Sequence, residues 1–203
     1  MDINLPDYKC KTQLKKGSIS GGVCIGVHRT IADSFRELNT GCQDIQAIIT
    51  KTCSRPDNER LTIINVYDFD ENSAYKARRK VVEEAASTLD LLIDFVAKNS
   101  LWKIYLAGDF NARTKNLNHD ITDDEEVSRE HRSEPSDVTR MSKDTTINKR
   151  GRLFLDFLAS TNITLLNGNT VGDIFGEFTS VNYHGCNVVD YVTVSAGLFG
   201  EYQ

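Results

Sequence analysis

The chain of 203 residues has no apolar run approaching the roughly 18 residues that a membrane-spanning helix needs. Its first residues include Asp2, Asp7 and Lys9, where a secretory signal peptide would be hydrophobic. The 5 cysteines are odd in number and form no Cys-x-x-Cys pair, so they predict neither a zinc site nor a disulfide framework. We therefore expect an intracellular protein, of the nucleus or the cytoplasm, that makes no membrane contact.

An excess of positive charge is also missing. The chain carries 24 lysines and arginines against 29 acidic residues, which gives a net charge of −5. Proteins that coat nucleic acid are usually basic, so this balance disfavours broad coating while leaving room for one local phosphate-binding cleft. With 39% hydrophobic residues, the chain has the composition of a globular protein and the length of a single domain, residues 1–203.

Short apolar segments along the chain have the length and composition of β-strands. They cover residues 21–27, 37–38, 45–49, 61–67, 104–107, 163–166 and 188–194. Residues 1–16 are polar and are expected to be irregular. Between these segments, apolar side chains recur at three- and four-residue spacing over residues 73–99, with Asn72 or Ser73 as the cap, and again over 153–158. Strands that alternate with helices predict an α/β fold.

Residues 113–147 contain few apolar side chains and many charges of both signs. Such a composition is typical of a mobile surface loop. Within this segment, Asp123 and Asp124 are adjacent carboxylates with no turn to fix them, so we expect ordinary loop residues rather than a metal site.

The candidate site begins at Gly108, Asp109, Phe110 and Asn111, directly after the predicted strand 104–107. Gly108 permits a sharp turn, and side chains two apart on an extended segment point the same way. A carboxylate beside a carboxamide suits an acid that orients a water and an amide that donates to a phosphate oxygen. Gly-Asp and Asn are also ordinary turn residues, so these residues alone do not distinguish a catalytic pair from a turn, and the other motifs of the chain are needed.

A second candidate is Asp190, a carboxylate inside a run of β-branched residues. Such a group needs a partner, because an unpaired buried charge costs several kcal/mol. Two interpretations follow: a structural buried pair, or an aspartate that orients a catalytic histidine.

Several motifs in order resemble the endonuclease/exonuclease/phosphatase superfamily. They include residues 65–67, 108–112, 148–153, 167–168 with 172–173, 178–179 and 188–195. The pattern is most similar to the apurinic-like endonuclease domain of non-LTR (LINE-type) retrotransposons. The resemblance implies a four-layer α/β/β/α sandwich of two mixed sheets with outer helices. It also implies phosphodiester hydrolysis of DNA with Mg²⁺ or Mn²⁺ as the cofactor.

By match to the family motifs, Asp109 resembles the carboxylate that activates the attacking water, and Asn111 the donor to the scissile phosphate. Tyr67 is similar to the active-site tyrosine near the phosphate, although residues 68–70 replace the prolines that usually follow it. Asp190 resembles the acid that fixes the orientation of the catalytic histidine.

Two parts of the family pattern have no match. The first family strands carry an asparagine and the metal-binding glutamate, and the last strand carries Ser-Asp-His; this chain begins after the former and stops before the latter. The metal ligands are thus unknown, with Asp109 as one candidate, and His28 and His184 lie in other segments. We expect a truncated domain that is weakly active or inactive and that self-associates through incomplete sheet edges. The alternatives are a non-catalytic remnant that binds nucleic acid or protein, and a phosphatase of the same superfamily.

Overall fold

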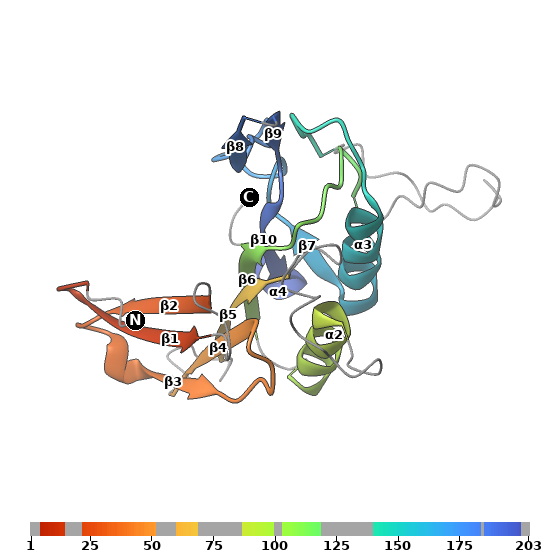
Figure 1. Cartoon of the computed structure of the whole chain (residues 1–203). Coiled ribbons are helices and arrows are strands. Elements are labelled where there is room, and N and C mark those ends of the chain that lie inside the picture. The colour runs from red at the N-terminus through yellow and green to blue at the C-terminus, as the bar shows by residue number, and fades with distance from the viewer. Residues whose placement is uncertain are drawn as a thin grey trace.

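A computed structural model describes residues 5–14, 22–51, 60–68, 87–99, 103–118, 140–183 and 185–199. Its centre is a six-stranded sheet with the strand order β3-β4-β5-β6-β10-β7 (Figure 1). These strands are β3 (Phe35–Leu38), β4 (Ile45–Thr50), β5 (Leu61–Tyr67), β6 (Lys103–Asp109), β10 (Asp190–Ser195) and β7 (Ile163–Leu165). Strands β5 and β6 run parallel, whereas the other neighbouring pairs are antiparallel. The sheet is therefore mixed.

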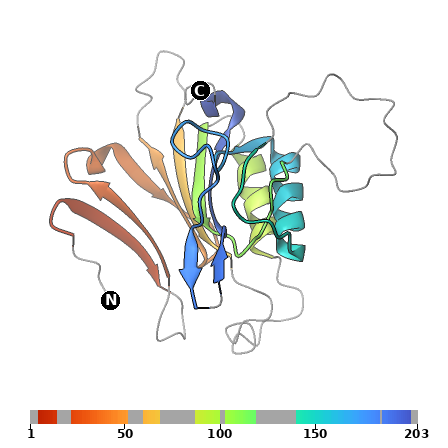
Figure 2. The same cartoon turned by 90° about the horizontal axis from the view of Figure 1, so that it is seen from above.

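One face of this sheet is covered by two helices, α2 (Thr88–Lys98) and α3 (Lys149–Thr161), which lie side by side (Figure 2). The alternation of β5 and β6 directs Ile64 and Leu106 into the layer between sheet and helices, where both are fully buried. Leu92 of α2 and Phe154 of α3 meet them there. Each buried side chain of this size contributes about 1.5–3 kcal/mol, so this layer is the main core.

The second face of the sheet carries an antiparallel hairpin of β1 (Tyr8–Leu14) and β2 (Gly22–His28), on the side away from the helices (Figure 2). The Asn65 side chain on β5 donates a hydrogen bond of 3.0 Å to the Cys24 carbonyl of the hairpin. Farther along this face, Leu198 of the short helix α4 (Ala196–Phe199) packs with Val194 and Leu166. A helix layer, the main sheet and a second β layer confirm the predicted α/β sandwich.

The remaining elements are short: η1 (Ala32–Ser34), β8 (Ser180–Asn182) and β9 (Gly185–Asn187), the last two paired as a small ribbon. Strands β3 and β7 form the two edges of the main sheet, and self-association through such edges stays a prediction. In the described ranges, no helix has the length and hydrophobicity to cross a membrane.

Three sequence-based expectations need correction. Residues 8–14 form strand β1 instead of irregular chain, because its exposed lysines Lys9 and Lys11 alternate with less exposed side chains in a ribbon of two strands. The helix expected over 73–99 begins at Thr88 where the structure describes it. Ser87 is extended there and forms a capping box with Asp90. The preceding residues 69–86, which include the expected cap at Asn72 or Ser73, lie outside the described ranges.

The expected mobile loop over 113–147 is ordered at both of its ends. Thr114 pairs with Ile147 in an isolated β-bridge, and the side chains of Thr114, Arg140 and Asp144 are almost completely buried. In the described ends, Arg113 forms an ion pair with buried Asp144, and Arg140 donates hydrogen bonds to backbone carbonyls. Residues 119–139 of the predicted loop, with Asp123 and Asp124, lie outside the described ranges.

Candidate active site

Three of the predicted site residues meet at one end of the main sheet. Tyr67, the last residue of β5, is paired in register with Asp109, the last residue of β6. Asp109 is in turn paired with Asp190, the first residue of β10. Residues directly opposite on neighbouring strands present their side chains on the same face, so three segments far apart in the sequence form one row. Each of the three side chains is partly exposed at this rim.

The position of Asp190 differs from the sequence-based expectation. The strand was expected to begin at residue 188 and to enclose this carboxylate, but β10 starts at Asp190 itself. The carboxylate lies at the rim, where solvent reduces the cost of its charge, so it does not form the deeply buried pair that one interpretation required.

The turn after β6 brings Asn111 to the same rim. Gly108 has φ +154°, and a Cβ atom at this position would lie 2.0 Å from the Val66 carbonyl oxygen, so only glycine fits. Asn111 has φ +48° and is not extended as expected. Its backbone N–H donates a 2.9 Å hydrogen bond to the Asp109 carboxylate, so a local turn, rather than strand alternation, brings the two residues together.

The side chain of Tyr67 lies in an acidic environment. Burial raises the pKa of the Tyr67 phenol, and the negative charges of Asp109 and Asp44 raise it further. The phenol is therefore a proton donor near neutral pH, and it is close enough to Asp109 for the two groups to act on one bound molecule.

Asp68, the next residue, is fully buried and forms an ion pair with Arg150 at the start of α3. Burial raises the pKa of Asp68 to about 6, although the hydrogen bonds from Arg150 act in the opposite direction. Its backbone belongs to the rim as well, because its N–H donates to the Asp109 carbonyl at 2.7 Å and its C=O accepts from the Asn111 side chain at 2.7 Å.

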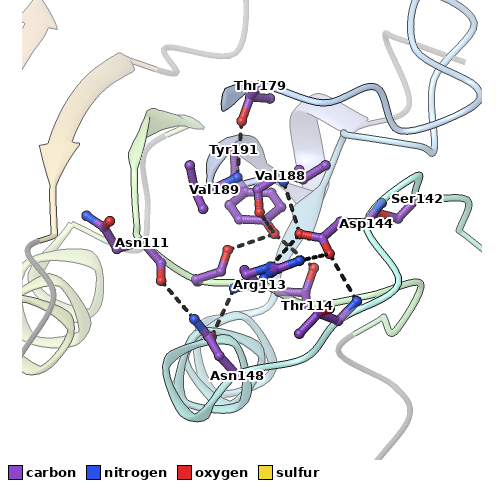
Figure 3. Close-up of polar contacts among 12 residues, drawn as sticks. Asn111, Arg113, Thr114, Ser142, Asp144, Asn148, Thr179, Val188, Val189 and Tyr191 are labelled. Atoms are coloured by element: carbon purple, nitrogen blue, oxygen red, sulfur yellow. Dashed lines mark hydrogen bonds and ion pairs between the residues drawn. The ribbon is translucent and has the colours of Figure 1, made fainter. Parts of the chain in front are cut away.

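A buried carboxylate, Asp144, connects the two loops that lead to the rim (Figure 3). It accepts hydrogen bonds of 2.8 and 2.7 Å from the Arg113 guanidinium, two residues after Asn111. It also accepts the backbone N–H of Val188, two residues before Asp190, at 3.1 Å. Burial alone would raise the pKa of Asp144, but the hydrogen bonds from Arg113 and from backbone N–H groups outweigh it and lower the pKa.

Asn148 fixes the same loop to helix α3. Its side-chain oxygen caps the helix by accepting the Gly151 N–H at 2.6 Å, and it also accepts the Arg113 N–H at 3.0 Å. Its side-chain nitrogen donates to the Asn111 carbonyl at 3.2 Å (Figure 3). Gly151 allows this contact, since a Cβ atom there would lie 2.0 Å from the Arg113 carbonyl oxygen.

Two further motif residues hold the backbone of Asp190. The Thr179 hydroxyl accepts the N–H of Val189 at 3.1 Å (Figure 3). It also accepts the N–H of Asp190 at 3.1 Å. Asn167 donates to the Asp190 carbonyl at 3.3 Å and accepts the Val192 N–H at 2.9 Å. The start of β10 is thus fixed from both sides.

Beneath the rim, the buried hydroxyl of Tyr191 lies 3.0 Å from the carbonyl oxygens of both Ala112 and Val188 (Figure 3). The guanidinium of buried Arg140 lies over its ring, 5.9 Å from the centroid, and donates to the carbonyls of Lys115, Leu117 and Asn167. Arg140 therefore joins the loop after Asn111 to the loop before the β8–β9 ribbon.

The described residues do not form a complete metal centre. In those ranges, no three histidine, cysteine, aspartate or glutamate side chains come together in a group that could hold a metal ion. His28 lies exposed at the end of β2, where its ring bonds to Thr30, and His184 lies outside the described ranges. The expected Mg²⁺ site thus has Asp109 as a candidate ligand but no ligand set in this part of the chain.

Sequence reasoning missed the residues that support the rim, namely Asp68, Arg113, Arg140 and Asp144. Each is charged, and a charged residue in a polar stretch predicts exposure rather than burial. The clearest signal lay in Asn148, Asn167 and Thr179, which belong to the motifs of the resemblance without a role derived from the residues.

Comparison with solved structures supports the same fold. The chain is similar to the AP endonuclease LMAP of Leishmania major, with a TM-score of 0.58 and 11% sequence identity over 96% of this chain and 64% of that one. It is also similar to the 3′ phosphatase NExo from Neisseria bound to a product DNA hairpin, with a TM-score of 0.53, 14% identity and coverage of 96% and 69%. The 3′-5′ exonuclease NExo of Neisseria meningitidis gives a TM-score of 0.51, 14% identity and the same coverage.

The chain spans somewhat under two thirds of the length of the Leishmania structure and slightly more than two thirds of the Neisseria structures. No protein-family model and no curated protein matches the sequence. At these levels of identity, the likeness establishes the fold of the endonuclease/exonuclease/phosphatase type.

Proposed function

We propose that this chain carries part of the active site of a phosphodiester hydrolase that acts on DNA, of the type found in LINE-like retrotransposons, with Mg²⁺ or Mn²⁺ as its cofactor. The observation that supports the proposal most strongly is the row of Tyr67, Asp109 and Asp190 on three adjacent strands, with Asn111 bonded to Asp109 at the same rim. These are the residues that the resemblance assigns to catalysis. The order of the motifs in the sequence supports the retrotransposon type.

The chain's own residues can carry out three parts of this reaction. The Asp109 carboxylate can orient a water and accept its proton. The Asn111 amide has two N–H groups, of which one bonds to the Asp68 carbonyl, so the other can donate to a phosphate oxygen. The Tyr67 hydroxyl, with its raised pKa, stays protonated and can donate to the same phosphate.

A second candidate function is non-catalytic binding of nucleic acid. The observation that favours it is that, in the described part of the chain, no three His, Cys, Asp or Glu side chains cluster in a way that could hold a metal ion. Binding by the rim would retain the donors of Asn111 and Tyr67 without the hydrolytic step.

A nicking assay separates these functions. The purified chain is incubated with supercoiled plasmid in Mg²⁺, in Mn²⁺ and in EDTA, and DNA binding is measured in parallel at several salt concentrations. The matched variants are Asp109→Asn at the rim and Asp94→Asn on the exposed side of α2.

Metal-dependent nicking that is lost in Asp109→Asn and kept in Asp94→Asn supports the hydrolase, even at a low rate. Salt-sensitive DNA binding without nicking supports the non-catalytic binding function. This comparison requires that both variants remain folded. A chain that neither nicks nor binds DNA contradicts both proposals.

A further inference from the structure

Asp68 and Arg150 form a charged pair in the interior, directly behind the candidate site. The Asp68 side chain is 0% exposed and that of Arg150 only 11%. The guanidinium of Arg150 contacts both carboxylate oxygens, with a 2.7 Å hydrogen bond from Nε to one and a second contact from Nη2 to the other. Such a two-point contact fixes the orientation of both side chains.

The pair lies in the segment where the sequence departs from the resembled pattern. In the resembled pattern, prolines usually follow the tyrosine that Tyr67 matches, whereas this chain has an aspartate directly after it. That aspartate, Asp68, forms the buried ion pair. The pair anchors residue 68 to the first turn of α3, which the Asn148 cap in turn holds.

The backbone of Asp68 transmits this anchoring to the site. Its N–H donates to the Asp109 carbonyl and its C=O accepts from Asn111 Nδ2, each at 2.7 Å. The terminal torsion of an asparagine side chain is otherwise broad, so the bond to the Asp68 carbonyl decides where the second amide proton points. The backbone of Asn111 is itself held by Asp109 and Asn148.

We propose that the Asp68–Arg150 pair is a positioning device that aims the Asn111 amide at the bound phosphate. The binding of a phosphate by the Asn111 amide rests on the proposed function, whereas the orientation of that amide by the ion pair can be measured in the chain without DNA. A pair that served only to join α3 to the sheet would change stability without acting on the Asn111 side chain in particular. The two roles therefore differ in what they do to one amide group.

Hydrogen exchange of side-chain amides, measured by NMR on the full chain at neutral pH, distinguishes the roles. Asn111→Asp identifies the Asn111 signal by its disappearance. Two other amides serve as internal controls in the same spectrum: Asn65, which donates to the Cys24 carbonyl, and Asn99, which donates to the Phe95 carbonyl at 2.6 Å. The test variants are Asp68→Asn and the double change Asp68→Asn with Arg150→Gln, which removes both charges together.

In Asp68→Asn we expect exchange of the Asn111 amide to accelerate about tenfold, the typical worth of one hydrogen bond, while Asn65 and Asn99 change less than about twofold. The double variant leaves no uncompensated charge, so it should be at least as stable as Asp68→Asn. It should show the same selective acceleration of exchange at the Asn111 amide. Arg150→Lys, which keeps the charge but loses the fork, should give an intermediate value.

Equal acceleration of all three amides, or an unchanged Asn111 amide in the double variant, would overturn the positioning role. Failure of the proposed function is recognised separately by adding a short DNA duplex. If positioning holds but DNA leaves the Asn111 amide signal unmoved, the device is real and the phosphate assignment is wrong.

Discussion

Replacing Asp144 with asparagine tests the part of the site that joins its two loops. The Asp144 side chain is 1% exposed and that of Arg113 is 30% exposed. Removing one partner of a buried ion pair typically costs about 3–5 kcal/mol. Arg113 can recover some hydration at its partly exposed end, which lowers this cost, but the new amide group also opposes the N–H of Val188. We expect a loss of about 3 kcal/mol in the free energy of unfolding.

Urea denaturation at pH 7, followed by circular dichroism, measures this loss. With a typical slope of about 2 kcal/mol per molar urea, the midpoint should fall by about 1.5 M. The neighbouring variant Lys143→Ala is the matched control, because it breaks an exposed ion pair with Glu177 and should change stability by no more than about 0.5 kcal/mol. A loss below about 1 kcal/mol for Asp144→Asn would refute the role of Asp144 in joining the two loops.

The pH dependence of the same difference gives a second check. The pKa of Asp144 is lowered in the folded chain, so its ionised form stabilises the protein above the unfolded-state pKa of about 3.9. This contribution is lost as the pH falls through the lower folded-state value. The difference between wild type and Asp144→Asn should therefore be constant near neutrality and shrink below about pH 4. A difference that grows in acid contradicts the assigned charge state.

Other changes test the elements around the site. Gly108→Ala places a Cβ against the backbone of β5 at positive φ and should lower the free energy of unfolding by about 3 kcal/mol or more, measured by thermal melts. Gly172 has open space around it, so Gly172→Ala should be near neutral in the same melts. Ser87→Ala removes the cap of α2 and should cost about 1 kcal/mol in urea denaturation. In spectrophotometric titration, the phenol signal of Tyr67, identified by its loss in Tyr67→Phe, should have a midpoint above pH 10. That midpoint should fall in Asp109→Asn, and an unshifted midpoint argues against the proximity of Tyr67 and Asp109.

Much of the fold follows from local sequence signals. Strand β5 has the predicted bounds, residues 61–67, because its apolar run is preceded in the sequence by the turn-forming residues Pro56, Asp57 and Asn58. The α/β class follows in the same way from the change between strand and helix periodicity. Strand β1 was missed, since a two-stranded ribbon with lysines on its exposed side lacks the apolar alternation of a core strand.

The sequence predicted the residues at the rim of the site, but it did not predict the buried charged residues that hold the rim in place. Asp109 and Asn111 stand in a short motif, but their proximity depends on the positive φ of Asn111, which the sequence pattern did not reveal. Asp144 lies far along the chain from Arg113 and is read as a solvent-exposed acid. Its burial depends on long-range pairing, and no local periodicity reports that.

The most direct test of the account is to map where a short DNA duplex contacts the chain, using backbone amide chemical shifts at low salt. The account predicts shifts concentrated at Tyr67, at residues 109–111 and at Asp190, weakening as salt is raised. Asp109→Asn should keep or strengthen this binding, because it removes a negative charge from the rim. Shifts confined to the β1–β2 hairpin or to helices α2 and α3, with the rim unmoved, would contradict the assignment of the site.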